Sequence, residues 1–308
     1  MKRRIASLFS MCCLVAAPLL AQTTIGGGTC TSASVSGIYA ISLTSRQVTA
    51  SGTFTGVSQA NGSATFDGLS QVTLSLVANT GKAVATPLTW SGTYSVQADC
   101  AGVINVTTTT GGSATLNMAI YQVGLNPVTF DFLLSGSDGS STYSGTGNTQ
   151  PAGCSAGTFS GVYAFNSTGF ALNGTSVSGV ENGSGLLQFD GVSKLTVNLT
   201  MSASGAAPSA LVLTGSYSIS ANCLGSATLT DASSNSYLMS FSVYNASLAN
   251  SAGYVGLARS STFLVTGNAH ATYGQPTANA AGHGPGDRPA LGMVEKPLSG
   301  SADRGGRA

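Results

Sequence analysis

The sequence predicts an all-β protein made of two tandem antiparallel meander β-barrels of about eight or nine strands each. Three observations predict this fold. Apolar residues alternate with Ser and Thr at a period of two, tight-turn pairs such as Asp-Gly recur at short intervals, and a set of sequence blocks occurs twice in the same order. Closing a meander into a barrel removes its exposed edges. The same patterns permit two-sheet β-sandwiches, which remain the alternative.

The chain begins with a short basic and apolar segment. Three basic residues at positions 2–4 precede an apolar run that ends at Leu20, and a small residue, Ala21, follows. This is the layout of a secretory signal peptide, and the run is short for a transmembrane helix. We expect residues 1–21 to be a signal peptide and the protein to be exported, with a periplasmic, extracellular or cell-surface location.

The body of the chain is nearly uncharged. Charged residues make up 7% of the sequence, whereas apolar residues make up 42% and recur in ordered patterns, which argues against a disordered linker. Residues 22–273 contain four basic against seven acidic side chains. Nucleic-acid binding needs a basic surface, so we expect no nucleic-acid partner. Residues 274–308 lose the pattern, and we expect them to form a disordered tail.

Two copies of one unit account for most of the chain. Five blocks recur in order at nearly constant spacing: Cys30–Tyr39 with Cys154–Tyr163, Phe66–Gly68 with Phe189–Gly191, Gly92–Val96 with Gly215–Ile219, Cys100–Gly102 with Cys223–Gly225, and Thr146–Asn148 with Thr266–Asn268. This order indicates a duplication. We place the first barrel repeat at residues 22–150 and the second at residues 151–273, with a Pro-Ala-Gly joint between them.

Strands and turns can be placed within each repeat. One strand of the first repeat alternates the apolar residues Leu88, Trp90, Gly92, Tyr94 and Val96 with polar ones, and Leu211 to Ile219 repeats it. A glycine inside such a buried row suggests a bend, a bulge or the close approach of another backbone. Turn signals occur at Asn61-Gly62, Asp67-Gly68, Gly111-Gly112, Asp138-Gly139, Asn182-Gly183 and Asp190-Gly191.

Four cysteines remain outside the predicted signal peptide: Cys30, Cys100, Cys154 and Cys223. An even number in an exported chain indicates disulfides, and four cysteines allow three pairings. Each repeat owns one cysteine near its start and one after its Gly-x-Tyr strand, so we expect Cys30 to pair with Cys100 and Cys154 with Cys223. Each bridge would close a loop of roughly 70 residues, worth about 4 kcal/mol. A redox or metal role is disfavoured because no Cys-x-x-Cys spacing exists.

The residues that usually carry catalysis are sparse. Histidine occurs only as His270 and His283, so neither repeat contains a Ser-His or Cys-His pair of its own. Among the carboxylates, only Asp67 and Asp190 recur at equivalent positions, and both precede glycine. That context indicates hairpin turns with positive φ angles more than a paired-carboxylate site. We expect no catalytic residue, no metal site and no cofactor, although enzymatic activity stays open.

Five aromatic residues are the best candidates for lining a ligand site: Tyr39, Trp90, Tyr94, Tyr163 and Tyr217. Inward aromatics of a small barrel can line a cavity for an apolar or sugar-like ligand. The competing interpretation, which we favour, is that they fill the core.

Two local patterns resemble known families. The segment Gly92–Gly102 resembles a Gly-Thr-Tyr-x-Val-x-x-Asp-Cys-x-Gly motif of uncharacterised secreted bacterial proteins, and the second repeat carries a variant of it. The starts at Gly37–Tyr39 and Gly161–Tyr163 are loosely similar to the Gly-x-Trp start of lipocalin (calycin) barrels, with Tyr in place of Trp. The first resemblance implies no activity, and the second implies a ligand-binding barrel.

The leading functional hypothesis is a secreted or cell-surface, non-catalytic protein with two disulfide-closed barrels and a binding or envelope-structural role. Its partner is unknown, and a small apolar or sugar-like ligand or a cell-envelope component are the candidates. One alternative is a small-barrel isomerase or cyclase acting on an apolar ligand, which would need Asp131 or a Tyr hydroxyl inside a deep cavity. Another is an outer-membrane β-barrel with both repeats in one wall.

Overall fold

A computed structural model describes residues 29–49, 51, 54–80, 86–109, 111–125, 128–174, 176–247, 250–259 and 262–272. The predicted signal peptide and tail lie outside the described residues. Within these ranges, no helix is both long enough and apolar enough to cross a membrane.

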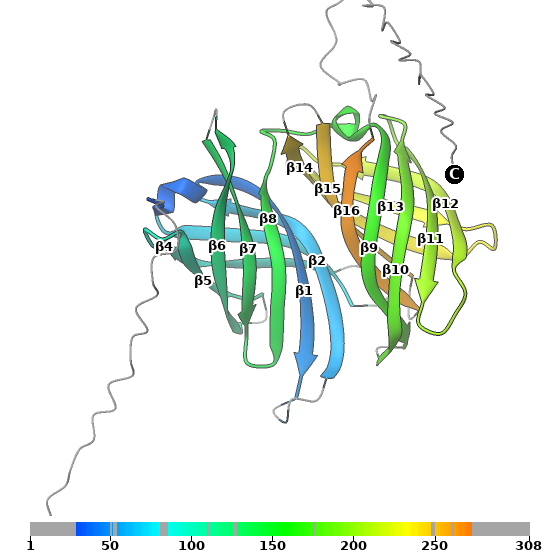
Figure 1. Ribbon diagram of the computed structural model, residues 1–308, viewed down its shortest axis with the longest axis horizontal. Coiled ribbons are helices and arrows are strands. Elements are labelled where there is room, and N and C mark those ends of the chain that lie inside the picture. The colour runs from blue at the N-terminus through cyan, green and yellow to red at the C-terminus, as the bar shows by residue number, and fades with distance from the viewer. Residues whose placement is uncertain are drawn as a thin grey trace, which may run out of the picture.

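The described chain folds into two closed antiparallel barrels of eight strands each (Figure 1). This confirms the predicted all-β tandem of barrels, and the sandwich alternative was wrong. The first barrel consists of β1 (Gly37–Val48), β2 (Phe54–Phe66), β3 (Gln71–Asn79), β4 (Thr86–Val96), β5 (Ala101–Thr107), β6 (Ser113–Leu125), β7 (Val128–Ser137) and β8 (Ser141–Thr149). The second consists of β9 (Gly161–Asn173), β10 (Ser176–Phe189), β11 (Lys194–Ala203), β12 (Ser209–Ile219), β13 (Leu224–Thr230), β14 (Ser236–Ser247), β15 (Asn250–Arg259) and β16 (Phe263–Ala271).

Each barrel is a simple meander that closes on itself. Strands pair in chain order, and β1 closes on β8 as β9 closes on β16. The two repeats therefore do not share one wall, as the outer-membrane alternative required. A short 3-10 helix precedes each barrel, η1 (Ser32–Val35) before β1 and η2 (Ala156–Phe159) before β9.

Asp67 and Asp190 hold equivalent turns. The Asp67 Oδ1 atom accepts hydrogen bonds from the backbone N–H groups of Leu69, Ser70 and Gln71 at 2.8–2.9 Å, and Asp190 does the same in the second repeat. The backbone N–H bonds hold the pKa of both carboxyls below the usual value. The predicted turns are confirmed. Within each Asp-Gly pair, only the glycine has a positive φ angle, so the aspartate stabilises the turn through the hydrogen bonds of its carboxylate.

Two of the predicted turns were wrong. Asn61-Gly62 lies inside β2 and Asn182-Gly183 lies inside β10. Two other strand glycines are needed because the neighbouring strand leaves no room for a side chain. A Cβ atom at Gly92 would lie 1.9 Å from the carbonyl oxygen of Asn105, and one at Gly215 would lie 2.0 Å from that of Thr228. Among a bend, a bulge and the close approach of another backbone, the structure shows that the repeated glycine permits close approach of the neighbouring strand.

Strand register corrects one of the sequence matches. Tyr39 pairs with Thr149, and its counterpart Tyr163 pairs with Ala271, so β8 and β16 correspond at an offset of 122 (271 − 149). The Thr-Gly-Asn blocks match at an offset of 120 and therefore occupy positions two residues apart along the wall. Because two residues is one strand period, the shared block keeps the same inward and outward faces.

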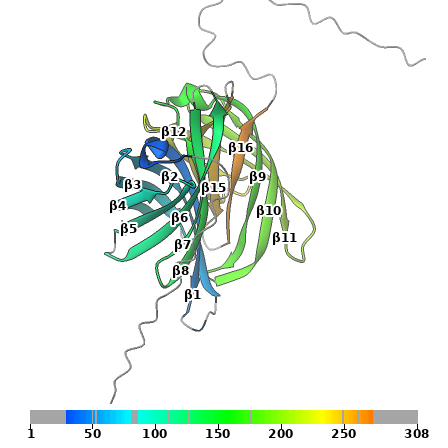
Figure 2. The same cartoon turned by 60° about the vertical axis from the view of Figure 1, so that its left-hand side comes forward.

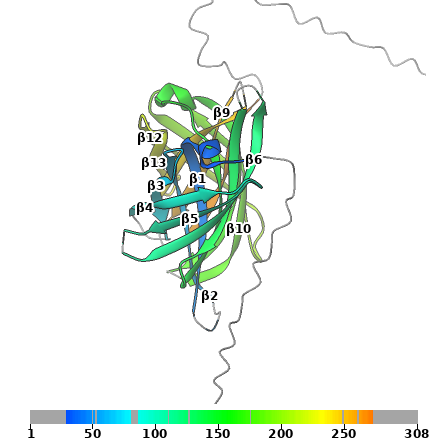
Figure 3. The ribbon, with the colours of Figure 1, turned by 90° about the vertical axis from the view of Figure 1, so that its left-hand side faces the viewer.

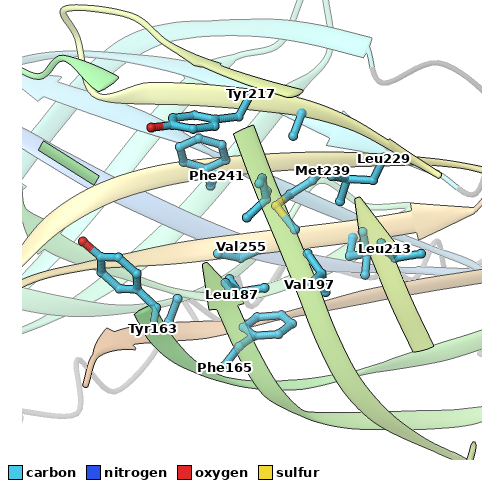
Figure 4. Packing of buried hydrophobic residues seen from close by; sticks show 14 of the residues in the cluster. Tyr163, Phe165, Leu187, Val197, Leu213, Tyr217, Leu229, Met239, Phe241 and Val255 are labelled. Atoms are coloured by element: carbon cyan, nitrogen blue, oxygen red, sulfur yellow. The ribbon is translucent and has the colours of Figure 1, made fainter. Parts of the chain in front are cut away.

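The interior of each barrel is filled with packed side chains. Figure 4 shows this for the second barrel, where Tyr163, Tyr217 and Phe241 lie among aliphatic residues. Phe189 is 5.0 Å from Tyr217 and 5.6 Å from Phe241, measured between ring centroids. The first barrel has an equivalent cluster around Phe66, whose ring centroid lies 4.9 Å from that of Tyr94.

The repeats fill the same space with a ring taken from different positions. In the first barrel, Phe132 of β7 packs on Phe66, and η1 contributes only Val35. In the second barrel, Gly253 occupies the position that corresponds to Phe132 in the strand register. The ring of Phe159 from η2 lies next to this glycine, 3.3 Å from where a Cβ atom of residue 253 would be. The exchange places an aromatic ring in the same part of both interiors, which indicates that filling this space is a requirement of the fold.

Both disulfides join cysteines of the same repeat, Cys30 with Cys100 and Cys154 with Cys223. This is the pairing that the duplication favours over the other two. Cys100 and Cys223 both adopt positive φ, at 66° and 63°. Each bridge ties the segment before the short 3-10 helix to the turn between the fourth and fifth strands, at the same end of each barrel.

Candidate functional site

The two barrels pack against each other side by side, and Figures 1 and 2 show β1, β2 and β8 next to the second barrel. Strands β1, β2 and β8 contact β14, strands β1 and β2 also contact β15, and β2 reaches β10 and β16. We call this contact the junction. It buries outward side chains that would face solvent on an isolated barrel.

Two tyrosines of the second barrel anchor one end of the junction. Tyr244 and Tyr254 are each 4% exposed and pack with Ala252 against Ala40 of β1. Their ring centroids lie 4.8 Å apart. The Tyr254 hydroxyl accepts a hydrogen bond from Thr146 Oγ1 at 2.6 Å.

A buried carboxylate lies beside these tyrosines. Asp131 of β7 is 4% exposed and points away from the barrel interior. Asn148 Nδ2 donates to Asp131 Oδ2 at 2.6 Å, and the backbone N–H of Thr149 donates to Oδ1 at 2.9 Å. Asn148 in turn accepts a hydrogen bond from the Tyr254 hydroxyl, which links the carboxylate to the second barrel.

Burial sets the ionisation of this cluster. It raises the pKa of the Asp131 carboxyl above its usual value, against the lowering effect of its hydrogen bonds. Burial, together with the Asp131 charge, also raises the pKa of Tyr244 to about 12. The tyrosines therefore stay protonated at neutral pH and act as hydrogen-bonding groups.

The middle of the junction is polar. Gln59 and Asn61 of β2 are 4% and 3% exposed, and Asn61 Nδ2 donates to Ser240 Oγ at 3.5 Å. Within the described residues, the side-chain oxygens of Gln59, Asn61 and Ser242 have no hydrogen-bond partner. The opposite end is apolar, because Val57 packs there in a cluster with second-barrel residues. A mixed surface of this kind resembles a protein–protein interface more than a domain core.

Next to the junction, an open hollow of about 530 Å³ lies on the outer wall of the second barrel. Its floor is formed by outward residues of β9 and β16, which run side by side in Figure 2. Figure 3 views the molecule from the side of the first barrel, with β3, β4 and β5 in front. Its lining includes Ala164, Asn166, Thr168, Thr266, Asn268 and His270. They stand as cross-strand pairs, Ala164 opposite His270, Asn166 opposite Asn268, and Thr168 opposite Thr266. The lining therefore offers amides, hydroxyls and one imidazole, with no carboxylate.

The predicted ligand-lining residues do not face this hollow. The structure places Tyr39, Trp90, Tyr94, Tyr163 and Tyr217 inside the barrels, each at most 5% exposed. Two of them have a structural hydrogen bond: the Tyr94 hydroxyl donates to the Ser32 carbonyl in η1 and the Tyr217 hydroxyl to the Ala156 carbonyl in η2, both at 3.0 Å. These equivalent bonds fix the short helix over the end of each barrel.

The other candidates are also separated from one another. His270 is exposed on β16, beside the opening strand of the second repeat, and its ring centroid lies 6.5 Å from that of Tyr244. Asp131, which with a Tyr hydroxyl was one of the two groups considered for a barrel-interior enzyme, lies at the junction. No group of three potential metal-ligating side chains occurs in the part of the chain that the structure describes.

No protein-family model matches the chain, and no curated protein matches it either. Among solved structures, the chain is similar to isotype 1 transferrin binding protein B from serogroup B Neisseria meningitidis. The similarity covers 77% of this chain and 76% of that chain, with 9% sequence identity and a TM-score of 0.26. A likeness this weak carries no argument about function.

Sequence reasoning missed the junction and the hollow. Ala40, Val57 and Asn61 lie on outward strand positions, where the period-two pattern predicts solvent exposure, yet all three are buried. The available signal was the outward tyrosines: Tyr254 stands on a face of β15 that otherwise carries Ala252, Gly256 and Ala258, and Tyr244 follows two outward serines on β14.

Proposed function

We propose that this chain is an exported or cell-surface protein without catalytic activity, and that it binds its partner through the outer walls of its barrels. The observation that carries the proposal is the contrast between the filled barrel interiors and the open hollow on the outer wall of the second barrel. The interiors hold the candidate aromatics packed against other side chains, whereas the hollow lies outside, between amides and hydroxyls. An apolar ligand enclosed in either barrel finds no support in this packing.

The near absence of charge agrees with a binding role on a cell envelope. Four of the seven described acids, Asp67, Asp138, Asp190 and Asp231, are occupied in turns, where their oxygens accept hydrogen bonds from backbone N–H groups. The outer walls thus recognise partners by hydrogen bonding and by shape. The intact disulfides support exposure to an oxidising compartment.

Cell fractionation and a binding assay test the proposal together. We expect the mature chain outside the cytoplasm, and we expect purified chain to bind washed cells in a saturable way. Asn166→Arg, in the hollow, should weaken this binding, whereas Thr214→Arg, an outward exposed position on β12, should leave it unchanged. Cytoplasmic retention, or binding that neither variant alters, would contradict the proposal.

A further inference from the structure

The hollow corresponds to the part of the first barrel that the second barrel covers. Ala164 is the counterpart of Ala40, because the adjacent tyrosines Tyr163 and Tyr39 match in the duplication. Through the strand pairings, the cross-strand neighbour of Ala40 is Asn148 and that of Ala164 is His270. The same register relates the other members of the hollow to first-barrel residues: Asn166 to Ser42, Asn268 to Thr146, and Thr168 to Thr44.

In the first barrel, this face is filled. Ala40 packs against Tyr244, and Thr146 and Asn148 bond the Tyr254 hydroxyl. We call the outward side of β8, β1 and β2 the docking face, and the same side of β16, β9 and β10 the open face. The open face has every register position of the docking face. The first barrel packs on it only at one end, where Val57 contacts the cluster of Leu172 and Leu264, and no described first-barrel residue lines the hollow.

Exposure differs between the two faces as this assignment requires. Val57 is 6% exposed on the docking face, and its register counterpart Val180 is 50% exposed on the open face. Ser63 is 5% exposed, whereas its counterpart Leu186 is 45% exposed. The open face therefore leaves two large apolar side chains in solvent at positions that the first repeat buries.

The complementary surface is left over on the first barrel. By register, Tyr244 corresponds to Tyr121 on β6 and Tyr254 corresponds to Leu133 on β7. Tyr244 and Tyr254 are 4% exposed in the junction, whereas Tyr121 is 41% and Leu133 is 51% exposed. We call the exposed part of the outward side of β6 and β7, which carries these two residues beside the buried Asp131, the free inserting face.

We propose that a second copy of this chain docks on the open face, placing Tyr121 and Leu133 of its first barrel into the hollow of the second barrel. The contact repeats the junction between molecules, with Tyr121 against Ala164 and Leu133 between Asn268 and His270. Because each molecule carries one open face and one free inserting face, the contact is heterologous and continues into chains or closes into rings. The second copy would occupy the hollow that Asn166→Arg probes in the cell-binding assay, but self-association is measured on purified chain alone and can therefore fail or succeed independently of binding to cells.

The connection between the barrels sets an upper bound on the dissociation constant that we expect for this contact. Inside one chain, the short joint between β8 and β9 holds the two barrels at an effective concentration in the millimolar range, about the value for short linkers. Separate molecules lack that advantage. Because the junction is closed, its dissociation constant lies below this effective concentration. We therefore expect the equivalent contact between molecules to form at or below about millimolar concentration in solution, and at lower bulk concentration where molecules are crowded on a surface.

Sedimentation velocity of the mature, disulfide-intact chain tests the proposal over about micromolar to millimolar concentrations. The weight-average mass should rise past that of a dimer. Leu133→Arg removes the inserting face and Ala164→Arg blocks the open face, so each variant alone should stay monomeric. Val212→Arg, at an exposed apolar position on β12, serves as the matched control and should associate like the parent.

Mixing the two blocked variants gives the decisive result. The Leu133→Arg protein keeps a working open face and the Ala164→Arg protein keeps a working inserting face, so an equimolar mixture should form dimers and nothing larger. Circular dichroism verifies that each variant is folded. A parent chain that stays monomeric at every concentration would overturn the proposal, as would a double variant, Leu133→Arg with Ala164→Arg, that associates as well as the parent.

Discussion

Truncating Phe241 to alanine measures whether the second barrel is solid or hollow. Phe241 is 2% exposed, and its ring lies within 5.4–6.3 Å of Phe159, Phe189 and Tyr217, centroid to centroid. A Cβ atom at Gly225 would lie 2.1 Å from this ring, so no room separates them. Removing a ring from such a packed site costs about 3 to 5 kcal/mol. At about 4 °C per kcal/mol for a domain of this size, the melting temperature of the second barrel falls by about 12 to 20 °C.

Thermal unfolding followed by two signals makes the test specific. The chain has a single tryptophan, Trp90, which is buried in the first barrel, so its fluorescence reports that barrel, and far-ultraviolet circular dichroism reports both. We expect Phe241→Ala to shift the dichroism transition more than the fluorescence transition. Thr230→Ala, exposed on β13, is the control and should cost less than about 0.5 kcal/mol. A loss below about 1 kcal/mol for Phe241→Ala would show that the interior is loosely filled and able to hold a ligand.

Three further predictions concern the covalent and polar parts of the fold. Replacing Cys30 and Cys100 together by alanine opens a 70-residue loop and should cost about 4 kcal/mol by chain entropy, read from urea denaturation of the first barrel; an unchanged midpoint would contradict this. Gly92→Ala places a Cβ 1.9 Å from the Asn105 carbonyl oxygen and should destabilise the first barrel by at least about 1 to 3 kcal/mol, whereas Gly157→Ala, with 3.8 Å to its nearest neighbour, should be nearly neutral. Asp131→Asn should remove a pH dependence: because burial raises the folded pKa of this carboxyl, its contribution is complete below about pH 4, the unfolded value, and is lost as pH rises through the folded pKa. Urea midpoints from pH 4 to 7 should therefore fall more steeply for the parent than for the variant, and parallel curves would refute the assignment.

The sequence was sufficient for the barrels because their determinants are local or duplicated. Alternation at a period of two identified the strand of Tyr94 and that of Tyr217, and the matched cysteines selected one pairing of three. Asp67 was placed in its turn from the residue after it. Each of these inferences needed only neighbours along the chain or the equivalent block of the other repeat.

The relation between the barrels could not be predicted in the same way. Ala40 and Ala164 have equivalent positions and identical side chains, yet one is buried and the other exposed. The difference depends on which wall of one barrel meets which wall of the other, and a residue pattern within one strand does not encode that. Asn61-Gly62 was mistaken for a turn because the pair has the composition of a hairpin, although close strand packing explains its glycine.

The proposed contact requires the open face of the second barrel to bind the free inserting face of another molecule. Photo-cross-linking from position 121, on the inserting face, is the most direct test of this binding. A benzoylphenylalanine in place of Tyr121 would be irradiated in an equal mixture of isotopically labelled and unlabelled chains, and the adducts mapped by mass spectrometry. We expect adducts between labelled and unlabelled molecules, on β9 or β16 near Ala164 and His270. Adducts confined to single molecules, or adducts between molecules that map to other walls, would contradict it.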